Sequence, residues 1–553
     1  MRKYSWLLSI LLALSVLVAA CAGAAPADTG GGEAMAEEEP AAEEEAASGP
    51  QYGGTLRLLL SETSPTYYSW EVSIAFDAVD ANTMTKLVPS TGEIVGDLAE
   101  SWDISDDGLT YTFRIHQNVR WHDGEALTAE DIAWSYNTVT DPAAQSIWGQ
   151  KLSDIVGFEA YQAGEIDTLE GVQVVDDHTL QITLQRPNAF FPSVLPDVSI
   201  WPKHILGDVP RGELRNHQFW VDQRIGSGPF KYAREVPGEF VEFTRNDDYF
   251  KGKPYIETVL MVRGSRDAHI TALEAGEVDG PMGEMSPQEV EHLNAMPHLF
   301  AGGAGGVSLP MFMAIKQTKP ELNLQFRQAV AHAIDRDAIL EEIFKEQVMM
   351  IDSFIPGGPY MKPNLEHWNY DPELSRQLLE EGGWDPEREL YIFYYYQQAW
   401  AHEMMTAIQA YLADVGIKSR IRYGDWSVDE QDWYLTDTAD IEMGAQSLFG
   451  SPDNFIQVSG CEYEYPAGWN GTHYCNERFD ELFQMAKTTT DEGARTDAYY
   501  EAQDILNEDL PFVWLFSKPA GIVYNNRVHI ESDGLYIWRR QFEKDIHLWW
   551  IEE

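Results

Sequence analysis

The chain has 553 residues, more than one hydrophobic core usually holds, so two or three lobes are expected. It is 44% hydrophobic and contains 18 tryptophans, which excludes global disorder. With 90 acidic residues against 38 basic ones the net charge is −52, and a surface this acidic repels phosphate backbones, which excludes nucleic acid as a partner.

The first 20 residues predict an export signal. A basic start, Arg2-Lys3, precedes an uncharged and mostly apolar run over residues 6–20 that is short for a membrane-spanning helix. The run ends in Val18-Ala19-Ala20-Cys21. This ending resembles the bacterial lipobox, in which small residues precede a cysteine that is lipidated and becomes the new N-terminus. Cys21 is therefore expected to carry a lipid anchor, and an ordinary secretory signal in which Cys21 is incidental is the alternative.

Residues 21–50 predict a solvated tether. Apart from one methionine, residues 22–50 are Ala, Gly, Pro, Thr and Ser with eight acids and no base. Such a segment cannot bury apolar area and repels itself, so it is expected to be disordered and extended. Because the tether holds only eight of the 90 acidic residues, the acidity belongs mainly to the body that follows.

The body mixes strands and helices without internal repeats, which predicts interwoven α/β lobes. Apolar or alternating runs bounded by turn residues predict strands at 54–60, 110–115, 240–245, and two within 172–184. Apolar residues at helical spacing predict helices at 324–344, 406–415 and 494–506. Thr128, followed by Glu130 and Asp131, predicts a capped helix start.

If Cys21 carries lipid, only Cys461 and Cys475 remain. An even pair in an exported chain predicts a disulfide that closes one loop, worth about 3 kcal/mol in the chain-entropy model. Two unpaired thiols are the alternative. Without a CxxC motif, a thiol redox enzyme or a cysteine-based zinc site is not expected.

Catalytic signatures are absent from the sequence. It contains no GxSxG elbow, HExxH helix or GxxxxGK[ST] loop, and His402-Glu403 lacks the second histidine of a zinc protease. The glycine-rich run at 302–306 lacks a following Lys-Ser/Thr pair and is interpreted as a loop or a crossover between lobes. We therefore expect no enzymatic activity, no cofactor and no bound metal.

Nine sequence blocks occur along the body in one characteristic order. They are Gly96–Trp102 with Gly108–Ile115, Val119–Gly124 (VRWHDG) with Leu127–Asp131, Ile225–Lys231 (IGSGPFK), Arg245–Asn246 with Tyr249–Pro254, Leu273–Asp279, Phe326–Arg336, Tyr370–Pro372 with Leu378–Leu379 and Gly382–Gly383, Asn476–Leu482, and Asp509–Pro511. In these blocks the chain resembles the extracellular solute-binding proteins of the peptide/nickel type that feed ABC importers.

The resemblance implies an α/β, two-lobed periplasmic-binding-protein fold with an extra subdomain inserted in lobe I. It assigns residues 51–94, 225–305 and 520–553 to lobe I, 95–224 to the subdomain and 306–519 to lobe II. It also implies that the lobes close on a solute about a hinge and deliver it to the transmembrane subunits of an ABC permease. We expect a monomer, anchored by lipid to the outer face of the cytoplasmic membrane.

The ligand is less well determined by the resemblance. Peptide-binding members resemble one another in a loop of the form Ala-Asp-Tyr-x-x-Pro, whose aspartate pairs with the peptide α-ammonium. The matching loop here is Gln446–Phe455, where Leu448 stands at the aspartate position. Asp453 or Asn454 is a candidate substitute, although an aspartate after proline is also typical of a helix cap.

The candidate ligand-binding residues are Trp148, Trp426, Gln446, Phe449, Asp453, Asn454 and Trp469. Their aromatic rings suit either an apolar side-chain pocket or stacking on a sugar. Oligopeptides are the first hypothesis for the ligand and oligosaccharides the alternative, while a nickel chelate is disfavoured by the absence of a local histidine cluster. An exported hydrolase or a signalling protein that imports nothing are the alternatives from other classes.

Overall fold

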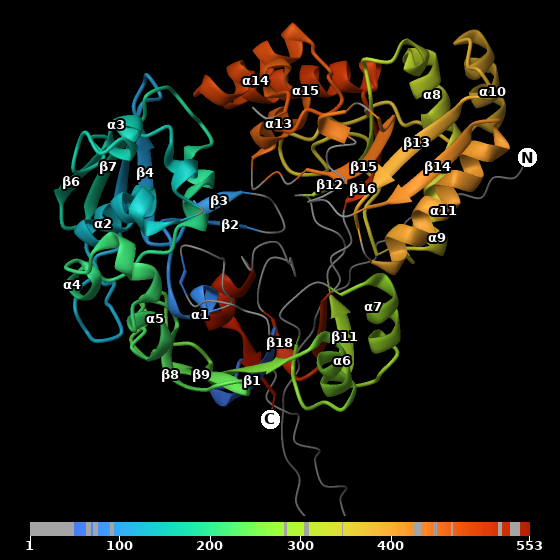
Figure 1. The fold of residues 1–553 in the computed structure, drawn as a ribbon. Coiled ribbons are helices and arrows are strands. Elements are labelled where there is room, and N and C mark those ends of the chain that lie inside the picture. The colour runs from blue at the N-terminus through green and yellow to red at the C-terminus, as the bar shows by residue number, and fades with distance from the viewer. Residues whose placement is uncertain are drawn as a thin grey trace, which may run out of the picture. The chain divides into compact units, whose positions relative to one another are not determined.

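The structure is a computed structural model (Figure 1). The residues that it describes are 49–61, 68–69, 76–88, 93–146, 148–280, 285–302, 309–345, 347–396, 398–424, 433–436, 438–446, 448, 451–465, 468–517, 522–530 and 542–552. The predicted signal, the predicted lipidation site at Cys21 and nearly all of the predicted tether lie outside these residues.

Three sheets of four or five strands organise the body. One contains β1 (Gly53–Ser61), β10 (Ile256–Gly264), β9 (Phe240–Arg245) and β8 (Phe230–Val236), in that spatial order. A second contains β4 (Ala99–Ile104), β5 (Thr110–Ile115), β7 (Thr179–Thr183) and β6 (Val172–Asp176). The third contains β14 (Lys418–Tyr423), β13 (Glu389–Tyr394), β15 (Ile441–Ala445), β12 (Pro310–Ile315) and β16 (Phe512–Ser517).

Shorter strands pair two by two: β2 (Thr85–Leu87) with β3 (Ile94–Gly96), β11 (Leu299–Gly302) with β17 (Ile522–Asn525), and β18 (Val528–His529) with β19 (Trp550–Ile551). The α-helices are α1 (Asp77–Asp80), α2 (Ala129–Thr140), α3 (Phe158–Gln162), α4 (Lys203–Leu206), α5 (Phe219–Asp222), α6 (Arg266–Glu274), α7 (Pro287–Asn294), α8 (Leu324–Ala333), α9 (Arg336–Glu342), α10 (Pro372–Glu381), α11 (Ala399–Asp414), α13 (Ile456–Ser459), α14 (Glu477–Thr488) and α15 (Glu492–Asp509).

Most of the predicted elements are confirmed. The predicted strands correspond to β1, β5, β6, β7 and β9. The predicted helix at 494–506 falls within α15, and the one at 406–415 overlaps α11, which begins earlier and ends at Asp414. The Thr128 cap is also confirmed, because Thr128 and Asp131 form a capping box at the start of α2.

The single helix predicted over 324–344 is wrong. The helix α8 ends before Ile334, whose backbone is extended. A second helix, α9, is then capped by Asp335, whose side chain accepts a hydrogen bond from the Ala338 amide at 2.9 Å. The apolar spacing continues across this break, so periodicity alone does not reveal that Asp335 caps a second helix.

The VRWHDG and IGSGPFK blocks meet in space. The Gly226 amide donates to His122 Nδ1 at 3.1 Å, and His122 Nε2 donates to the Gly228 carbonyl at 3.0 Å. A Cβ on Gly226 would lie 1.7 Å from the Asp80 carbonyl oxygen, so only glycine fits there. Burial lowers the pKa of His122 to about 4, which keeps the ring neutral in this structural role.

The five-stranded sheet has two different faces because successive side chains alternate. Met313 and Met443 point into one apolar cluster, which includes buried residues of α8, α9, α10 and α11. Phe312, Phe393 and Phe512 point into a second cluster, with residues of α13, α14 and α15. In Figure 1 these two sets of helices lie on different sides of the sheet. The face toward α14 and α15 carries the candidate site.

Candidate functional site

A pocket of about 290 Å³ opens on the face of the five-stranded sheet that carries Phe312, Phe393 and Phe512. Its floor comes from β12, β15 and β16, and its walls from residues 433–434 and the segment 468–472. The described residues that line it are Phe312, Ala314, Tyr395, Trp433, Tyr434, Glu442, Gly444, Ala445, Gln446, Val458, Trp469, Gly471, Thr472 and Phe512.

Strand register creates the hollow in the floor. In the antiparallel pair β12–β15, Ala314 lies opposite Glu442, and Phe312 lies opposite Gly444. On this face the small residues Ala314 and Gly444 thus alternate with larger ones, and the space that their small size leaves above the sheet forms the hollow. A Cβ on Gly444 would lie 3.4 Å from the carboxyl carbon of Glu442, which places that carboxyl group directly over the glycine.

Glu442 is the carboxylate of this floor. Its side chain is buried, with 5% of the residue exposed, and among the described residues none donates a hydrogen bond to it. Burial raises the pKa of Glu442 to about 8, and the positive charge of Lys316 opposes this shift. The Lys316 ammonium itself donates to the Trp433 carbonyl at 2.6 Å and lies 4.4 Å from the centre of the indole ring.

Aromatic side chains form the wall beside Glu442. The Tyr434 ring stacks on Tyr465 at 5.2 Å and meets Trp469 edge-on at 5.8 Å between ring centres. The Trp433 indole lies against Gly471, where an added Cβ would be only 2.1 Å from Nε1. This close approach explains why a glycine stands in the wall at 471.

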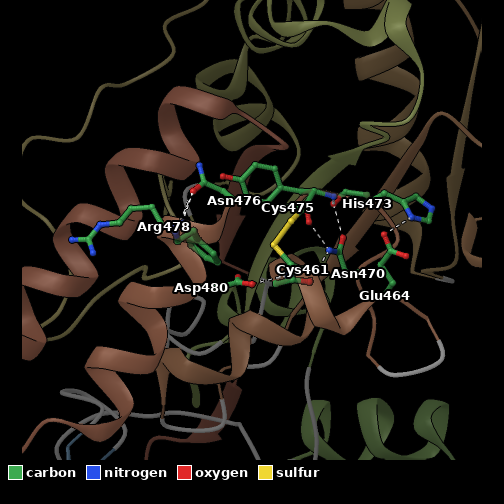
Figure 2. The surroundings of a disulfide bond; sticks show 12 residues. Cys461, Glu464, Asn470, His473, Cys475, Asn476, Arg478 and Asp480 are labelled. Carbon is green, nitrogen blue, oxygen red and sulfur yellow. Dashed lines mark hydrogen bonds and ion pairs between the residues drawn. A yellow bond between two sulfur atoms is a disulfide. The ribbon is translucent and has the colours of Figure 1, made fainter.

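The segment 468–472 is part of a loop closed by a disulfide. As predicted, Cys461 and Cys475 are bonded to each other (Figure 2). Inside the loop the Asn470 amide nitrogen donates to the carbonyls of Gly460 and Tyr474, at 3.0 and 2.8 Å. The Gln317 amide donates to the Thr472 carbonyl at 2.8 Å, which ties the loop to the end of β12. The disulfide therefore supports one wall of the pocket.

The structure brings some of the predicted site residues to this pocket and not others. Gln446 and Trp469 line it, and Trp469 is 43% exposed. Trp148 lies instead in the apolar cluster of the segment 68–220, where the Lys151 ammonium is 5.3 Å from its ring centre. Trp426 and Phe449 lie outside the described residues.

Asp453 and Asn454 lie beside the pocket lining rather than in it. The carboxylate of Asp453 faces the Lys487 ammonium at 3.5 Å; burial raises its pKa, and Lys487 opposes that shift. The Asn454 side chain donates to the Leu448 carbonyl at 2.7 Å. The helix cap in this loop is Ser451, whose hydroxyl accepts from the Asp453 amide, so Asp453 is not the cap.

Sequence reasoning missed Glu442, Tyr395, Trp433 and Tyr434. One signal was present: Glu442 is the only charged residue in Ile441–Ala445, a short run whose other members are apolar or glycine. A lone charge in a buried strand requires a partner or a function. The aromatic residues carry no comparable signal, because tyrosine and tryptophan are frequent throughout this chain.

The described residues contain no group of three or more His, Cys, Asp or Glu side chains placed to hold a metal ion. None of their helices combines the length and apolar character needed to cross a bilayer.

Comparison with known proteins identifies the family. The sequence profile of the bacterial extracellular solute-binding proteins, family 5 (middle part) matches residues 93–463, more than half of the chain. The chain belongs to this family. A family 5 solute-binding protein is exported, and it serves as the substrate-binding component of an ABC importer rather than as an enzyme.

Two relatives resemble the chain over most of its length. A Brucella ovis protein named as an ABC transporter peptide-binding protein is 30% identical, over 77% of this chain and 79% of its own. The di/tripeptide-binding protein 2 of Pseudomonas aeruginosa is 27% identical, over 78% of this chain and 82% of its own.

A solved structure of the same fold is that of the ABC transporter substrate-binding protein CtaP from Listeria monocytogenes. It superposes with a TM-score of 0.76 at 21% identity, covering 91% of this chain and 100% of CtaP. The likeness confirms the predicted α/β periplasmic-binding-protein fold.

Proposed function

We propose that this family 5 protein captures small peptides outside the cytoplasmic membrane, in a site that includes the pocket over Glu442, and delivers them to the permease subunits of its importer. The observation that carries the proposal is the position of the pocket: an aromatic-walled hollow on the sheet of the segment 306–519, with most of its lining residues in the region 93–463 that the family profile matches. The names of the Brucella and Pseudomonas relatives support a peptide as the solute.

The size of the pocket supports a small ligand group. Small-molecule sites usually measure about 300–1,000 Å³, and this one is at the lower end with 290 Å³. One side chain or a dipeptide fills such a volume, so a longer peptide extends beyond it.

Capture is by hinge closure between two lobes. Lobe I comprises residues 51–94, 225–305 and 520–553, with the subdomain 95–224 inserted in it, and lobe II comprises 306–519. Two observations support this division. All strands of the sheet β1-β10-β9-β8 come from the residues assigned to lobe I, and all strands of the five-stranded sheet come from lobe II. Closure is favoured when the solute contacts both lobes, because only such a ligand binds the closed form better than the open one. The protein acts as a monomer, anchored through lipid on Cys21.

An oligosaccharide is the second candidate. Trp469 is 43% exposed at the pocket and packs against Tyr434, and such a platform suits stacking on a sugar ring.

A thermal-shift screen decides between the two ligand classes. Di- to pentapeptides are compared with cello- and xylo-oligosaccharides, each at a fixed protein concentration. A ligand at 100 times its Kd stabilises the folded protein by about 2.7 kcal/mol, which is a readily measured rise in Tm. We expect peptides to raise Tm. Stabilisation by the sugars alone would contradict the peptide proposal.

A further inference from the structure

We propose that the pocket receives a cationic group of the solute, a guanidinium or an ammonium, and that Glu442 is its counter-charge. The proposal rests on the proposed function, because it specifies the solute class for the same pocket.

Glu442 is a buried residue whose carboxylate has no hydrogen-bond donor among the described residues. Only 5% of the residue is exposed, and its side chain lines the pocket. Two other buried carboxylates are ion-paired at close range: Asp279 with Arg527 at 2.7 Å, and Asp440 with Lys319 at 2.8 Å. Leaving a buried carboxylate without such a partner is costly. A carboxylate that lines a cavity in this condition is explained by a ligand that supplies the missing partner.

Aromatic rings line the pocket around Glu442. Tyr395, Trp433, Tyr434 and Trp469 all line the same hollow as Glu442. Aromatic faces attract cations, and a carboxylate beside several rings is the arrangement by which proteins bind ammonium and guanidinium groups. Trp433 already attracts one cation of the protein itself, the Lys316 ammonium at 4.4 Å from its ring centre.

The charge of the described pocket lining comes from Glu442. Among the described lining residues Glu442 is the only one with an ionisable carboxyl or amine, and burial raises the pKa of the Tyr395 phenol well above its usual value, so that ring stays neutral. Lys316 does not line the pocket, and its ammonium is held by the Trp433 carbonyl. The neighbouring Arg420 lies over Tyr391, 4.1 Å from that ring centre. Once Glu442 is ionised, a carboxylate group of a solute would meet a like charge in this pocket, whereas a cation would meet an opposite one.

Calorimetry with matched probes tests the proposal. The tripeptide Gly-Arg-Gly is compared with Gly-citrulline-Gly, whose side chain has nearly the same shape without the charge, and with agmatine, which carries a guanidinium and an ammonium without a peptide bond. All three are titrated into the whole protein at one pH. We expect Gly-Arg-Gly to bind about 100-fold more tightly than its citrulline counterpart, the usual consequence of removing one partner from a buried charge pair.

The variant Glu442→Gln and its control sharpen the result. Glutamine has nearly the same shape, so this variant should fold, and it should abolish the preference for arginine over citrulline. Glu389→Gln changes an exposed glutamate at the start of β13 in the same sheet and should leave the preference intact. The comparison of the two peptides on the unaltered protein tests the proposal even if a variant does not fold.

The contrary outcomes separate this inference from the proposed function. Equal affinity for the two peptides would overturn the cation inference and leave peptide capture standing. Binding of agmatine without either peptide would support the cation inference and contradict peptide capture. If neither arginine probe binds, the cation inference is wrong.

Discussion

The two faces of the five-stranded sheet share one backbone and both pack against apolar clusters, but only one of them leaves a hollow. Toward α8–α11, Met313, Ile392 and Met443 are completely buried in a continuous apolar cluster. Toward α14 and α15, Ala314 and Gly444 stand at comparable positions, and the space that they leave becomes the pocket. Because the hydrogen bonds between strands are common to both faces, the hollow is a property of side-chain size alone. One face stabilises the sheet and the other is available for a ligand.

Glu442→Gln should have the largest effect of these variants, because it should stabilise the folded protein at high pH while abolishing the preference for a cationic solute. The pKa of Glu442 in the folded protein is about 8, above its ordinary value of 4.5. Between these pH values the folded state keeps a proton that the unfolded state has lost, so stability falls as pH rises through this window and remains lower above pH 8. Glutamine carries no such penalty, so the variant should be more stable by up to about 5 kcal/mol above pH 8, with the gain vanishing below pH 4.5.

Denaturant unfolding at pH 5 and pH 9 measures this effect, with Glu389→Gln as the exposed control. A gain for Glu442→Gln of the same size at both pH values would show that burial of the charge is not its cause.

Met443→Ala changes the residue next to Glu442 on the opposite face. Deleting a fully buried methionine side chain should cost about 2–5 kcal/mol of unfolding free energy, because it removes apolar contacts and leaves a cavity. Solute affinity should be unchanged. Calorimetry on the folded variant checks this, and a large loss of affinity would show that the two faces are coupled through the strand.

Removing the disulfide should weaken the wall of the pocket. The double variant Cys461→Ser/Cys475→Ser should lose about 3 kcal/mol of stability, the value expected for a loop of this length. It should also bind solute more weakly, because Trp469 and Gly471 lie within that loop. Unfolding and titration of the double variant measure both effects, and unchanged affinity would show that the hydrogen bonds of Asn470 hold the wall without the covalent bond.

The affinity for a guanidinium probe should depend on pH. A cation binds the ionised form of Glu442, so below its pKa of about 8 binding must release a proton. The affinity should rise about tenfold for each pH unit between 6 and 8 and level off above. The guanidinium does not titrate in this range, and burial raises the pKa of the nearby Tyr395 phenol well above it. Calorimetry of agmatine across the range checks the slope, and a flat profile would exclude Glu442 as the counter-charge.

Trp469→Leu should have the smallest effect. Because Trp469 is 43% exposed, its replacement should change stability by less than about 0.5 kcal/mol. Loss of one cation–π contact should lower the affinity for an arginine peptide about fivefold. Trp384→Leu is the control, since this tryptophan stacks on Phe326 in the apolar cluster on the opposite face of the sheet. Equal losses of affinity in the two variants would show that Trp469 does not contact the solute.

Much of the fold follows from local patterns, and the site follows only in part. Strand alternation located β5, β7 and β9, and the motif blocks implied the family. The helix break at Asp335 was not predicted, because a capping residue inside an apolar repeat leaves the periodicity unchanged. The role of Glu442 was not predicted for a different reason. Its position in a pocket depends on the strand register that sets it opposite Ala314, a residue more than a hundred positions earlier in the chain. Pairing at that range is not written in either strand by itself.

The loop closed by Cys461 and Cys475 also bears on when the protein becomes competent to bind. Thiols stay reduced in the cytoplasm, and disulfides form after export. A newly made chain therefore lacks the bond that supports Trp469 and Gly471, and we expect its pocket to be complete only on the far side of the membrane. Before export, the protein should therefore bind the solutes of the cytoplasm only weakly.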